Sequence, residues 1–320
     1  MEKIKVGQIG CGNWGKNIAR NLVDLNVLHK IWDVDVKSLR LRNINDSLIT
    51  DNVSEIFNDK MIDCVVISSP ASTHKEFAIK AISKNKHVFI EKPFCLSLKD
   101  AKTIIRAAKK HNKIIFVGHL LHYHNAFIEL KKQLASGSIG NINIIKANRL
   151  NFGLIRSTES VIYDLVCHDV SMILSIMQEM PRDIQVNSIF KNSSNLPDIV
   201  NIILKFSKNV FAKINADWIS PYKEHRFSVL GTNGSMVFDD NKKWGEKLCL
   251  NPSYISKGLK IIYKKEKFIK LKEEEPLKKE LESFLDCITY NKQPITNHLE
   301  ALNVQKVLES IDKKLSYFKD

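Results

Sequence analysis

The sequence predicts an α/β protein of two domains, a doubly wound parallel sheet followed by an α+β domain with a large, open, mainly antiparallel sheet. Up to residue 119, apolar segments of strand length alternate with segments of helical periodicity, the pattern of a parallel sheet with helices on both faces. After residue 119, strand-length segments follow one another with turn signals between them. A chain of 320 residues suits two ordinary domains, which we place at residues 1–119 and 120–320.

The first half begins with a buried strand over Lys3–Gly10 and a helix over Asn17–Leu25, whose apolar residues recur at helical spacing. The further predicted strands are Val27–Asp35, Ile62–Pro70, His87–Pro93 and Lys113–His119. The helices between them are predicted over Val53–Asp59, Thr73–Lys86 and Ser97–Asn112. The order of these segments predicts a parallel sheet of Rossmann type.

The second half begins with an amphipathic helix over Asn125–Ser136, and a second helix includes "YDLVCHDVSMILSIM". Strand segments follow, in which "SKN", "GTNG" and "KKEK" stand where hairpin turns are expected, and two helical segments end the chain. Along one strand, Ile202 and Leu204 oppose Ile203 and Phe206, which predicts a sheet that is apolar on both faces. A second copy of the same sheet would cover the second face, so we expect a homodimer or homotetramer.

Composition narrows the class of protein. Hydrophobic residues make up 44% and charged residues 26%, as in globular proteins, and no apolar run reaches the roughly 18 residues that cross a bilayer. The first residues enter a strand without the apolar region of a signal peptide. The cysteines are scattered and none has metal-ligand spacing. We therefore expect a cytoplasmic protein with reduced thiols, no membrane partner and no metal.

The net charge of +14 raises the question of a nucleic-acid partner. Only eight of the 49 basic residues are arginine, the side chain most used to read bases, and the lysines are spread along the chain. We expect a solvated, lysine-rich surface and no nucleic-acid partner. The charge can still attract an anionic small molecule.

The stretch "GQIGCGNWGKN" carries the pattern G-x-G-x-x-G at Gly10, Gly12 and Gly15, between a strand and a helix. In dinucleotide-binding folds these glycines permit the tight turn, the approach of a pyrophosphate, and helix–strand packing. Asp33 ends the second strand, eighteen residues after Gly15, where a carboxylate binds the ribose hydroxyls. This carboxylate favours NAD over NADP, although Lys37 and Arg40 follow closely.

Two further groups of residues have the chemistry of a catalytic site. Lys92 ends a predicted strand at the edge where doubly wound sheets bind ligands, so it can reach the cofactor crevice; a surface ion pair is the alternative. Asp164 and His168 are four residues apart, which places them on one face of a helix and suits acid–base chemistry. Metal ligation is also possible for this pair, and so is a purely structural role. Cys167 is a poor partner for His168, because adjacent helical residues diverge by about 100°.

Taken together, "GCGNWG", "VVISSPASTH", "HVFIEKPF", the D-x-x-x-H pair and "LGTNGSMVFDD" resemble the Gfo/Idh/MocA oxidoreductases over nearly the whole chain. The resemblance implies an NAD-binding Rossmann domain, a second domain with an open sheet, and pairing of subunits through that sheet. It also implies that Lys92, Asp164 and His168 form the catalytic set. The cofactor contacts that it implies are Gly10, Gly12, Asn13, Trp14, Gly15, Asp33, Ser69, Pro70, His74 and Glu91.

Within the family, "NRLNFGLIR" and "GHLLHYH" are similar to the branch of UDP-N-acetylglucosamine and UDP-N-acetylglucosaminuronate 3-dehydrogenases of surface-polysaccharide synthesis. Asp164 instead matches the inositol dehydrogenase pattern. The resemblance implies hydride transfer between a sugar secondary alcohol and nicotinamide, with His168 as general base. Candidate substrate contacts are Arg149, Asn151, Arg156 and Tyr163. A dehydrogenase of a free polyol such as inositol and a non-catalytic, cofactor-binding regulatory protein are the alternatives.

Overall fold

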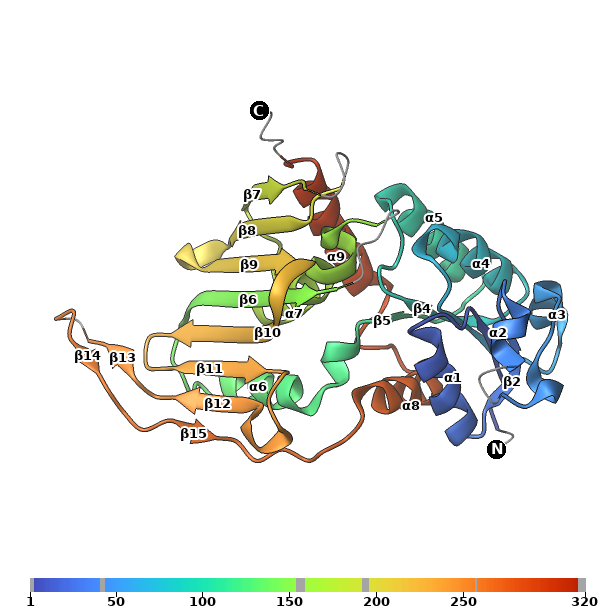
Figure 1. Ribbon diagram of the computed structural model, residues 1–320, viewed down its shortest axis with the longest axis horizontal. Helices are drawn as coiled ribbons and strands as arrows, with labels where there is room; N and C mark the ends of the chain where they lie inside the picture. The colour runs from blue at the N-terminus through green and yellow to red at the C-terminus, as the bar shows by residue number, and fades with distance from the viewer. Residues whose placement is uncertain (1–2, 41–43, 154–158, 192–195, 257, 316–320) are drawn as a thin grey trace. The chain divides into compact units, whose positions relative to one another are not determined.

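The structure is a computed structural model that describes residues 3–40, 44–153, 159–191, 196–256 and 258–315. Contacts within the chain divide it into two compact units (Figure 1). Unit 1 comprises Met1–Leu120 and Glu275–Gln305, and unit 2 comprises Leu121–Glu274 and Lys306–Asp320. The segment Glu275–Gln305, which we predicted as part of the second domain, therefore belongs to unit 1.

Unit 1 is built on a five-stranded parallel sheet with the strand order β2-β1-β3-β4-β5. The strands are β1 (Val6–Ile9), β2 (Leu28–Trp32), β3 (Cys64–Ile67), β4 (His87–Glu91) and β5 (Ile115–Gly118). Each lies inside a predicted strand, and the Rossmann-type sheet is confirmed. Because the order reverses beside β1, the carboxyl ends of β1 and its neighbours form the edge where such sheets bind ligands.

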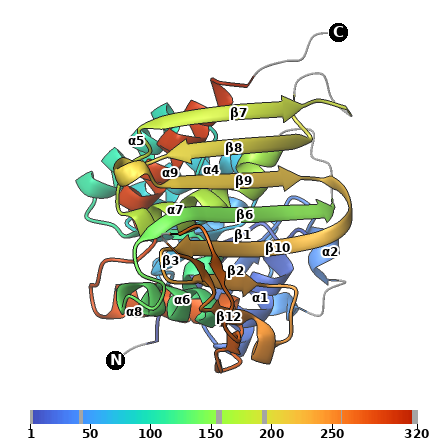
Figure 2. The ribbon, with the colours of Figure 1, turned by 90° about the vertical axis from the view of Figure 1, so that its left-hand side faces the viewer.

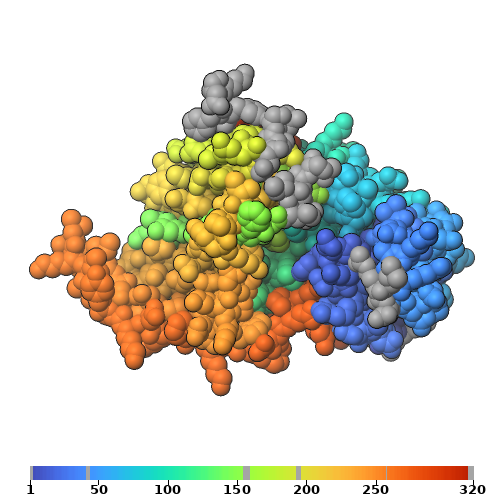
Figure 3. All heavy atoms as spheres, in the orientation of Figure 1, coloured from blue at the N-terminus to red at the C-terminus, as the bar shows by residue number. Residues whose placement is uncertain are grey.

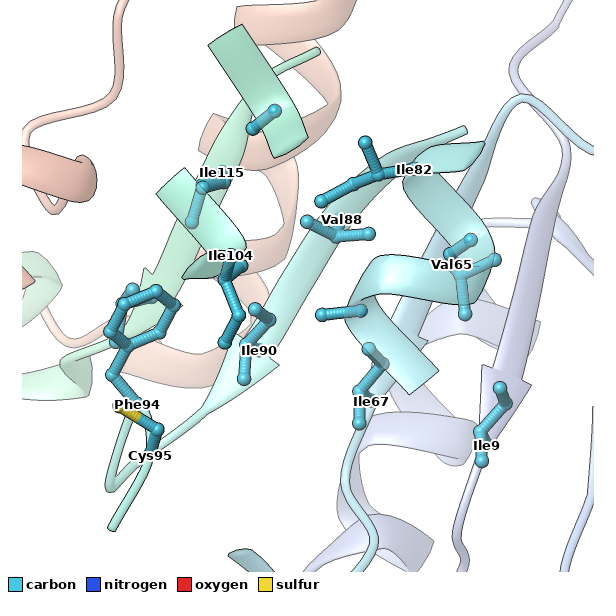
Figure 4. Close-up of a cluster of buried hydrophobic side chains, with 14 of the residues drawn as sticks. Ile9, Val65, Ile67, Ile82, Val88, Ile90, Phe94, Cys95, Ile104 and Ile115 are labelled. Carbon is cyan, nitrogen blue, oxygen red and sulfur yellow. The ribbon is translucent and has the colours of Figure 1, made fainter. Parts of the chain in front are cut away.

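One face of this sheet carries the apolar core of unit 1. Side chains of β1, β3, β4 and β5 meet those of four helices there, and Figure 4 shows Ile67, Val88 and Ile90 of the strands beside Ile82 and Ile104 of the helices. The helices of unit 1 are α1 (Gly15–Asp24), α2 (Val36–Arg40), α3 (Val53–Asn58), α4 (Ala71–Ser83), α5 (Leu98–Lys110) and α8 (Pro276–Thr289). Of these, α3, α4 and α5 cover this face, together with the start of α9 (His298–Asp312), which contributes Ala301.

The opposite face of the sheet is covered by α1 and α8. Phe284 of α8 contacts the rings of Phe89 and Phe116, with centroid distances of 5.6 and 5.4 Å. Phe284 is fully buried. Burial of the apolar face of α8 against this sheet explains why the helix belongs to unit 1, although most of unit 2 precedes it in the sequence. The sequence predicts a helix here but not which sheet it covers.

Unit 2 contains an eight-stranded sheet with the order β15-β12-β11-β10-β6-β9-β8-β7. Figure 2 shows β7, β8, β9, β6 and β10 side by side. The pair β6–β9 is parallel and the other pairs are antiparallel, which confirms the mainly antiparallel sheet. Its strands are β6 (Ile142–Phe152), β7 (Asp183–Ile189), β8 (Ile199–Lys205), β9 (Phe211–Asp217), β10 (Ile219–Gly231), β11 (Ser235–Asp239), β12 (Leu248–Asn251) and β15 (Lys267–Phe268).

The two faces of this sheet differ more than we predicted. Ile202 and Leu204 are fully buried, and Phe206, which we assigned to the other face, is buried with them because it lies an even number of residues away. Ile203, on the opposite face, is 39% exposed. That face also carries a row of paired asparagines across four strands: Asn187, Asn201, Asn215 and Asn148. The second face is therefore mixed rather than apolar.

The expected hairpin at "KKEK" is wrong. The segment separates β14 (Ile261–Ile262) from β15, but β14 pairs with β13 (Tyr254–Ile255) and β15 pairs with β12. The ribbon of β13 and β14, in orange in Figure 3, exposes large apolar side chains, among them Leu259 at 86% and Tyr263 at 81%. The turns "SKN" and "GTNG" do connect β8 to β9 and β10 to β11, as predicted.

The helices of unit 2 are α6 (Asn125–Ala135), a π-helix (Ile162–Val166), α7 (Cys167–Met177) and the end of α9 (His298–Asp312). Short 3₁₀ segments cover Asp46–Leu48, Leu120–Tyr123, Ser207–Asn209 and Trp244–Glu246. Across the described ranges, no helix is both long and apolar enough to cross a membrane. In the same residues, no cluster of three or more His, Cys, Asp or Glu side chains is arranged to hold a metal ion.

Candidate active site

The glycine-rich loop connects β1 to α1, and its three glycines meet different surroundings. Gly10 has a φ of +92°, and an added Cβ would lie 2.5 Å from the backbone nitrogen of Ser69. A Cβ on Gly15 would lie 2.7 Å from the carbonyl oxygen of Gly10. At Gly12, by contrast, no atom lies within 4 Å. Gly10 and Gly15 are therefore required by the fold, whereas Gly12 leaves space for a ligand to approach the backbone.

Gln8 fixes the shape of this loop, a role that we did not predict. Its side chain is fully buried, and its Nε2 donates to the carbonyl oxygens of Gly10 at 2.9 Å and Gly15 at 2.8 Å. The only signal in the sequence is a polar amide inside the apolar strand "VGQI". Buried polar groups are normally paired, so such a residue indicates a partner nearby.

Asp33 lies at the carboxyl end of β2, directly behind the loop. One carboxylate oxygen accepts from the backbone N–H of Cys11 at 2.5 Å, and the other from that of Asp35 at 2.9 Å. Each oxygen retains a second lone pair, which can accept from a ribose hydroxyl. The open approach at Gly12 and the carboxylate of Asp33 thus fit a dinucleotide, and the negative charge favours NAD because it repels a 2′-phosphate.

We expect Asp33→Ala to weaken NAD binding more than NADP binding, by roughly tenfold in the affinity ratio, the worth of one hydrogen bond to a charged group. Titration calorimetry with both cofactors measures the ratio. Asp33→Asn is the matched control, because it can still accept from the Cys11 amide while it removes the charge. An unchanged NAD/NADP ratio in both variants would overturn the ribose assignment.

His74 ties together the two loops that follow β3 and β4. The ring is 1% exposed, and its two nitrogens lie 3.0 Å from the carbonyl oxygen of Pro93 and 2.9 Å from that of Ser69. Ser68 donates from its hydroxyl to the carbonyl oxygen of Gly10 at 2.7 Å. The predicted cofactor residues Ser69, Pro70 and His74 thus lie at the same edge of the sheet as the glycine loop. His74 is buried there and connects the loops that follow β3 and β4.

Glu91 and Lys92, at the end of β4, have different surroundings. The Glu91 carboxylate is buried on the face that α8 covers, where it accepts from Trp14 Nε1 at 2.8 Å and from the Lys92 backbone N–H at 3.1 Å. Burial raises the pKa of Glu91, against the opposing effect of the Trp14 hydrogen bond. Glu91 therefore fastens the exposed Trp14 of the glycine loop to β4, and the half-buried Lys92 follows at the carboxyl edge of the sheet.

Glu280 of α8 is a second buried carboxyl group on this face. It is 0% exposed, and neither of its carboxyl oxygens has a hydrogen-bond partner among the described residues. Burial, and then the charge of Glu91, raise its pKa well above the ordinary value of 4.5. Glu280 therefore keeps its proton to a higher pH in the folded protein than in the unfolded chain. The folded protein binds this proton and the unfolded chain releases it, so the free energy of unfolding falls as the pH rises above about 4.5.

We expect Glu280→Gln to remove this pH dependence. Relative to the wild type, the variant should gain up to about 1.4 kcal/mol in the free energy of unfolding for each pH unit above the unfolded-state pKa, the linkage value for one proton. Urea unfolding between pH 5 and about 8 measures it. The exposed Glu282→Gln, on the same helix, is the matched control and should follow the wild type. Parallel curves for Glu280→Gln and the wild type would contradict the buried neutral acid.

In unit 2, Asp164 and His168 lie on either side of a change in helix type. Asp164 lies in the π-helix, where it is 8% exposed, and His168 lies in the first turn of α7. Residues 161–173 are buried with the exception of His168, which is half-buried. We predicted a continuous α-helix; π-helical turns are rare and frequently occur at functional sites. Asp164 is thus buried, whereas His168 is half-buried and has its Nδ1 shielded from solvent.

The predicted substrate residues differ in their burial and in their contacts. Tyr163 lies beside Asp164 in the π-helix and is 8% exposed. Asn151, near the end of β6, is half-buried, and its side-chain oxygen has no hydrogen-bond partner in the described part of the chain. Arg149 is 9% exposed and forms an ion pair with Asp169, which occupies two of its nitrogens. Arg156 lies outside the described residues.

Two family models match the chain. Residues 4–119 match the model described as "Oxidoreductase family, NAD-binding Rossmann fold", of the GFO/IDH/MocA group. Residues 127–237 match the GFO/IDH/MocA C-terminal domain. Together they cover more than half of the chain, in the order that we predicted.

Similar proteins include polyol and sugar enzymes. A myo-inositol 2-dehydrogenase of Thermotoga maritima is 28% identical over 260 residues, which cover 74% of this chain and 75% of that protein. The structure of a UDP-N-acetylglucosamine 3-dehydrogenase, GnnA, from Acidithiobacillus ferrooxidans has a TM-score of 0.84 at 20% identity, and covers 98% of both chains. GenD2 from gentamicin A biosynthesis, solved in complex with NAD, has a TM-score of 0.80 at 17% identity, with 98% of this chain and 94% of that chain covered. At these identities the two structures share the fold.

Proposed function

The chain belongs to the Gfo/Idh/MocA family of NAD-binding oxidoreductases, and we propose that it transfers a hydride between a secondary alcohol of a UDP-linked, N-acetylated sugar and nicotinamide. We further propose that the reaction serves the synthesis of surface-polysaccharide sugars. One observation above all supports the oxidoreductase chemistry. Lys92, a cation, follows directly on Glu91, which is joined to the glycine loop, so it lies at the edge where the sheet binds its cofactor.

When bound, NAD supplies the carbon that accepts the hydride. His168 would take the hydroxyl proton as general base, because imidazole is the side chain most often used for this role and this residue is half-buried. The buried carboxylate of Asp164 would orient the imidazole and stabilise its charged form. Lys92 would donate a hydrogen bond to the substrate oxygen and stabilise the negative charge that develops there.

For the substrate, the proposal retains Tyr163 and Asn151 as contacts to sugar hydroxyls or the N-acetyl group. Arg149 is left out, because its guanidinium is already bound to Asp169. The net charge of +14 favours an anionic diphosphate over a neutral sugar.

A free polyol such as an inositol is the second candidate substrate. It is favoured by Asp164, which matches the inositol dehydrogenase pattern, and by a relative of that activity at 28% identity. Titration calorimetry of the NADH-loaded protein distinguishes the two. UDP-N-acetylglucosamine should bind and be displaced by UDP alone, whereas myo-inositol should not bind. Binding of myo-inositol without binding of UDP would assign the polyol instead.

We also propose a homodimer or homotetramer formed through the mixed face of the eight-stranded sheet. This face exposes Ile144, Ile189 and Ile203 by 37 to 40% around the row of asparagines. Light scattering at micromolar concentration should give at least twice the chain mass of 36.7 kDa. Ile203→Lys should shift the protein toward the single-chain mass, because it places a charge in the apolar part of the interface. A wild-type protein of single-chain mass would contradict the proposal.

A further inference from the structure

A buried ion pair holds the first turn of α7 to the sheet of unit 2. Arg149 Nε lies 3.0 Å from one oxygen of Asp169, and Nη2 lies 2.9 Å from the other, so the pair is bidentate. Arg149 is 9% and Asp169 2% exposed. Two parallel hydrogen bonds fix direction as well as distance, which a single contact does not. Asp169 is therefore held in one orientation relative to β6.

The position of this anchor in the sequence is informative. Asp169 directly follows His168, and the π-helix ends at Val166, two residues before His168. A π-helical turn rotates the following residues relative to an α-helix, so the direction of His168 depends on how α7 is held after it. A second contact lies within the same turn, where Ser171 Oγ is 2.7 Å from His122 Nε2. The helix that presents the imidazole is thus fixed at residues 169 and 171.

On the neighbouring strand β10, His225 lies beside Arg149. His225 lies opposite Arg149 in the register of β10 and β6, and burial, followed by the charge of Arg149, lowers its pKa to about 4. His225 is therefore neutral at physiological pH and adds no positive charge that would repel Arg149. A cavity of about 10 Å³ is lined by Arg149, His225 and Asp240, at the lower limit of the space that one water needs. With 11% of its side chain exposed, Arg149 offers little surface to a ligand.

We propose that Arg149 is a positioning residue for His168, acting through the carboxylate of Asp169 to set the direction in which α7 presents the imidazole. The inference rests on the proposed role of His168 as general base. It replaces the role in substrate binding that the sequence suggested for Arg149. A displacement of about 1 Å at a catalytic group can reduce turnover by roughly 10²-fold, so an intact pair should matter to the rate.

The test uses variants that avoid leaving one charge buried alone, which would destabilise the fold. Arg149→Met combined with Asp169→Leu removes both charges and keeps similar volumes. Arg149→Lys keeps the charge but loses the planar fork. The control pair is Arg226→Met with Asp239→Leu, which removes another ion pair of the same sheet, with a distance of 3.0 Å. Each variant is measured for NADH affinity, for kcat and KM, and for the His168 imidazole signals in NMR as a function of pH.

We expect the double variant to bind NADH normally and to lose about 10²-fold in kcat with little change in KM, because the base is misplaced rather than removed. Arg149→Lys should lie between it and the wild type, and the control pair should retain kcat. The His168 signals should shift or broaden in the double variant and, to a smaller extent, in Arg149→Lys, and should be unchanged in the control pair. Wild-type kcat together with unchanged His168 signals would overturn the inference.

If no sugar or polyol is turned over by the wild type, the proposed function fails, and the NMR comparison still decides whether Arg149 positions His168. If the double variant does not fold, Arg149→Lys decides by the same readouts.

Discussion

His168→Ala is expected to reduce turnover by about 10²–10⁴-fold, the typical contribution of a positioned acid–base group. The methyl group of alanine cannot take the hydroxyl proton, so the alcohol would have to lose its hydride without a base. NADH affinity should be unchanged, because His168 belongs to unit 2 and the dinucleotide residues to unit 1. Steady-state rates together with calorimetric titration of NADH separate the two effects.

Lys92→Ala should cause a loss of similar size, for a different reason. Without the ammonium group, the charge that develops on the substrate oxygen is no longer stabilised. His111→Ala, at the end of α5, is the control for His168→Ala, because it replaces a histidine that has no proposed role. Near-normal turnover in His168→Ala or in Lys92→Ala would remove that residue from the mechanism.

Gly12→Val is expected to abolish detectable binding of NAD without changing stability. Apart from the chain neighbours of Gly12, no atom of the described residues lies within 4 Å of the position that a Cβ would take, so the side chain meets the space needed by the pyrophosphate. Loss of one or two hydrogen bonds to a charged group, at about 1.5–3 kcal/mol each, corresponds to roughly 10²-fold or more in affinity. Titration calorimetry measures the affinity, and thermal unfolding of the unliganded protein measures the stability.

Two other glycines control this experiment. At Gly245, as at Gly12, no atom lies within 4 Å, so Gly245→Val should change neither binding nor stability. Gly10→Ala should destabilise the fold itself, since its Cβ would lie 2.5 Å from a backbone atom and its φ is +92°. A Gly12→Val protein that binds NAD like the wild type would mean that the dinucleotide does not approach the loop at this point.

The parts of the fold that could be predicted are those in which local sequence determines the structure. The strands of unit 1 are short apolar segments bounded by turn residues, and Gly10, Gly12 and Gly15 meet a conformational or steric requirement of the loop itself. Asp33 followed from its spacing alone. Within the candidate site, the glycine-rich loop and the carboxylate of Asp33 could therefore be predicted from the sequence.

The parts that could not be predicted depend on partners far away in the sequence. Helix α8 is amphipathic, but only the aromatic contact of Phe284 with Phe89 assigns it to unit 1. The sequence shows Arg149 as a free cation, whereas Asp169, on another element, neutralises it. The widened turn of the π-helix has no local signal in "IYDLV". In each of these cases tertiary packing, rather than local propensity, determines the outcome.

The central claim is that the chain transfers a hydride from a sugar CH–OH group to NAD. The most direct test incubates the wild-type protein with NAD and a UDP-N-acetylglucosamine or UDP-N-acetylglucosaminuronate that carries deuterium on its ring carbons, with deuterated myo-inositol in parallel. Mass spectrometry then measures deuterium in the reduced nicotinamide. We predict that deuterium appears in NADH from a UDP-linked sugar, and that His168→Ala suppresses it. Absence of deuterium from the nicotinamide with all of these compounds would contradict the claim.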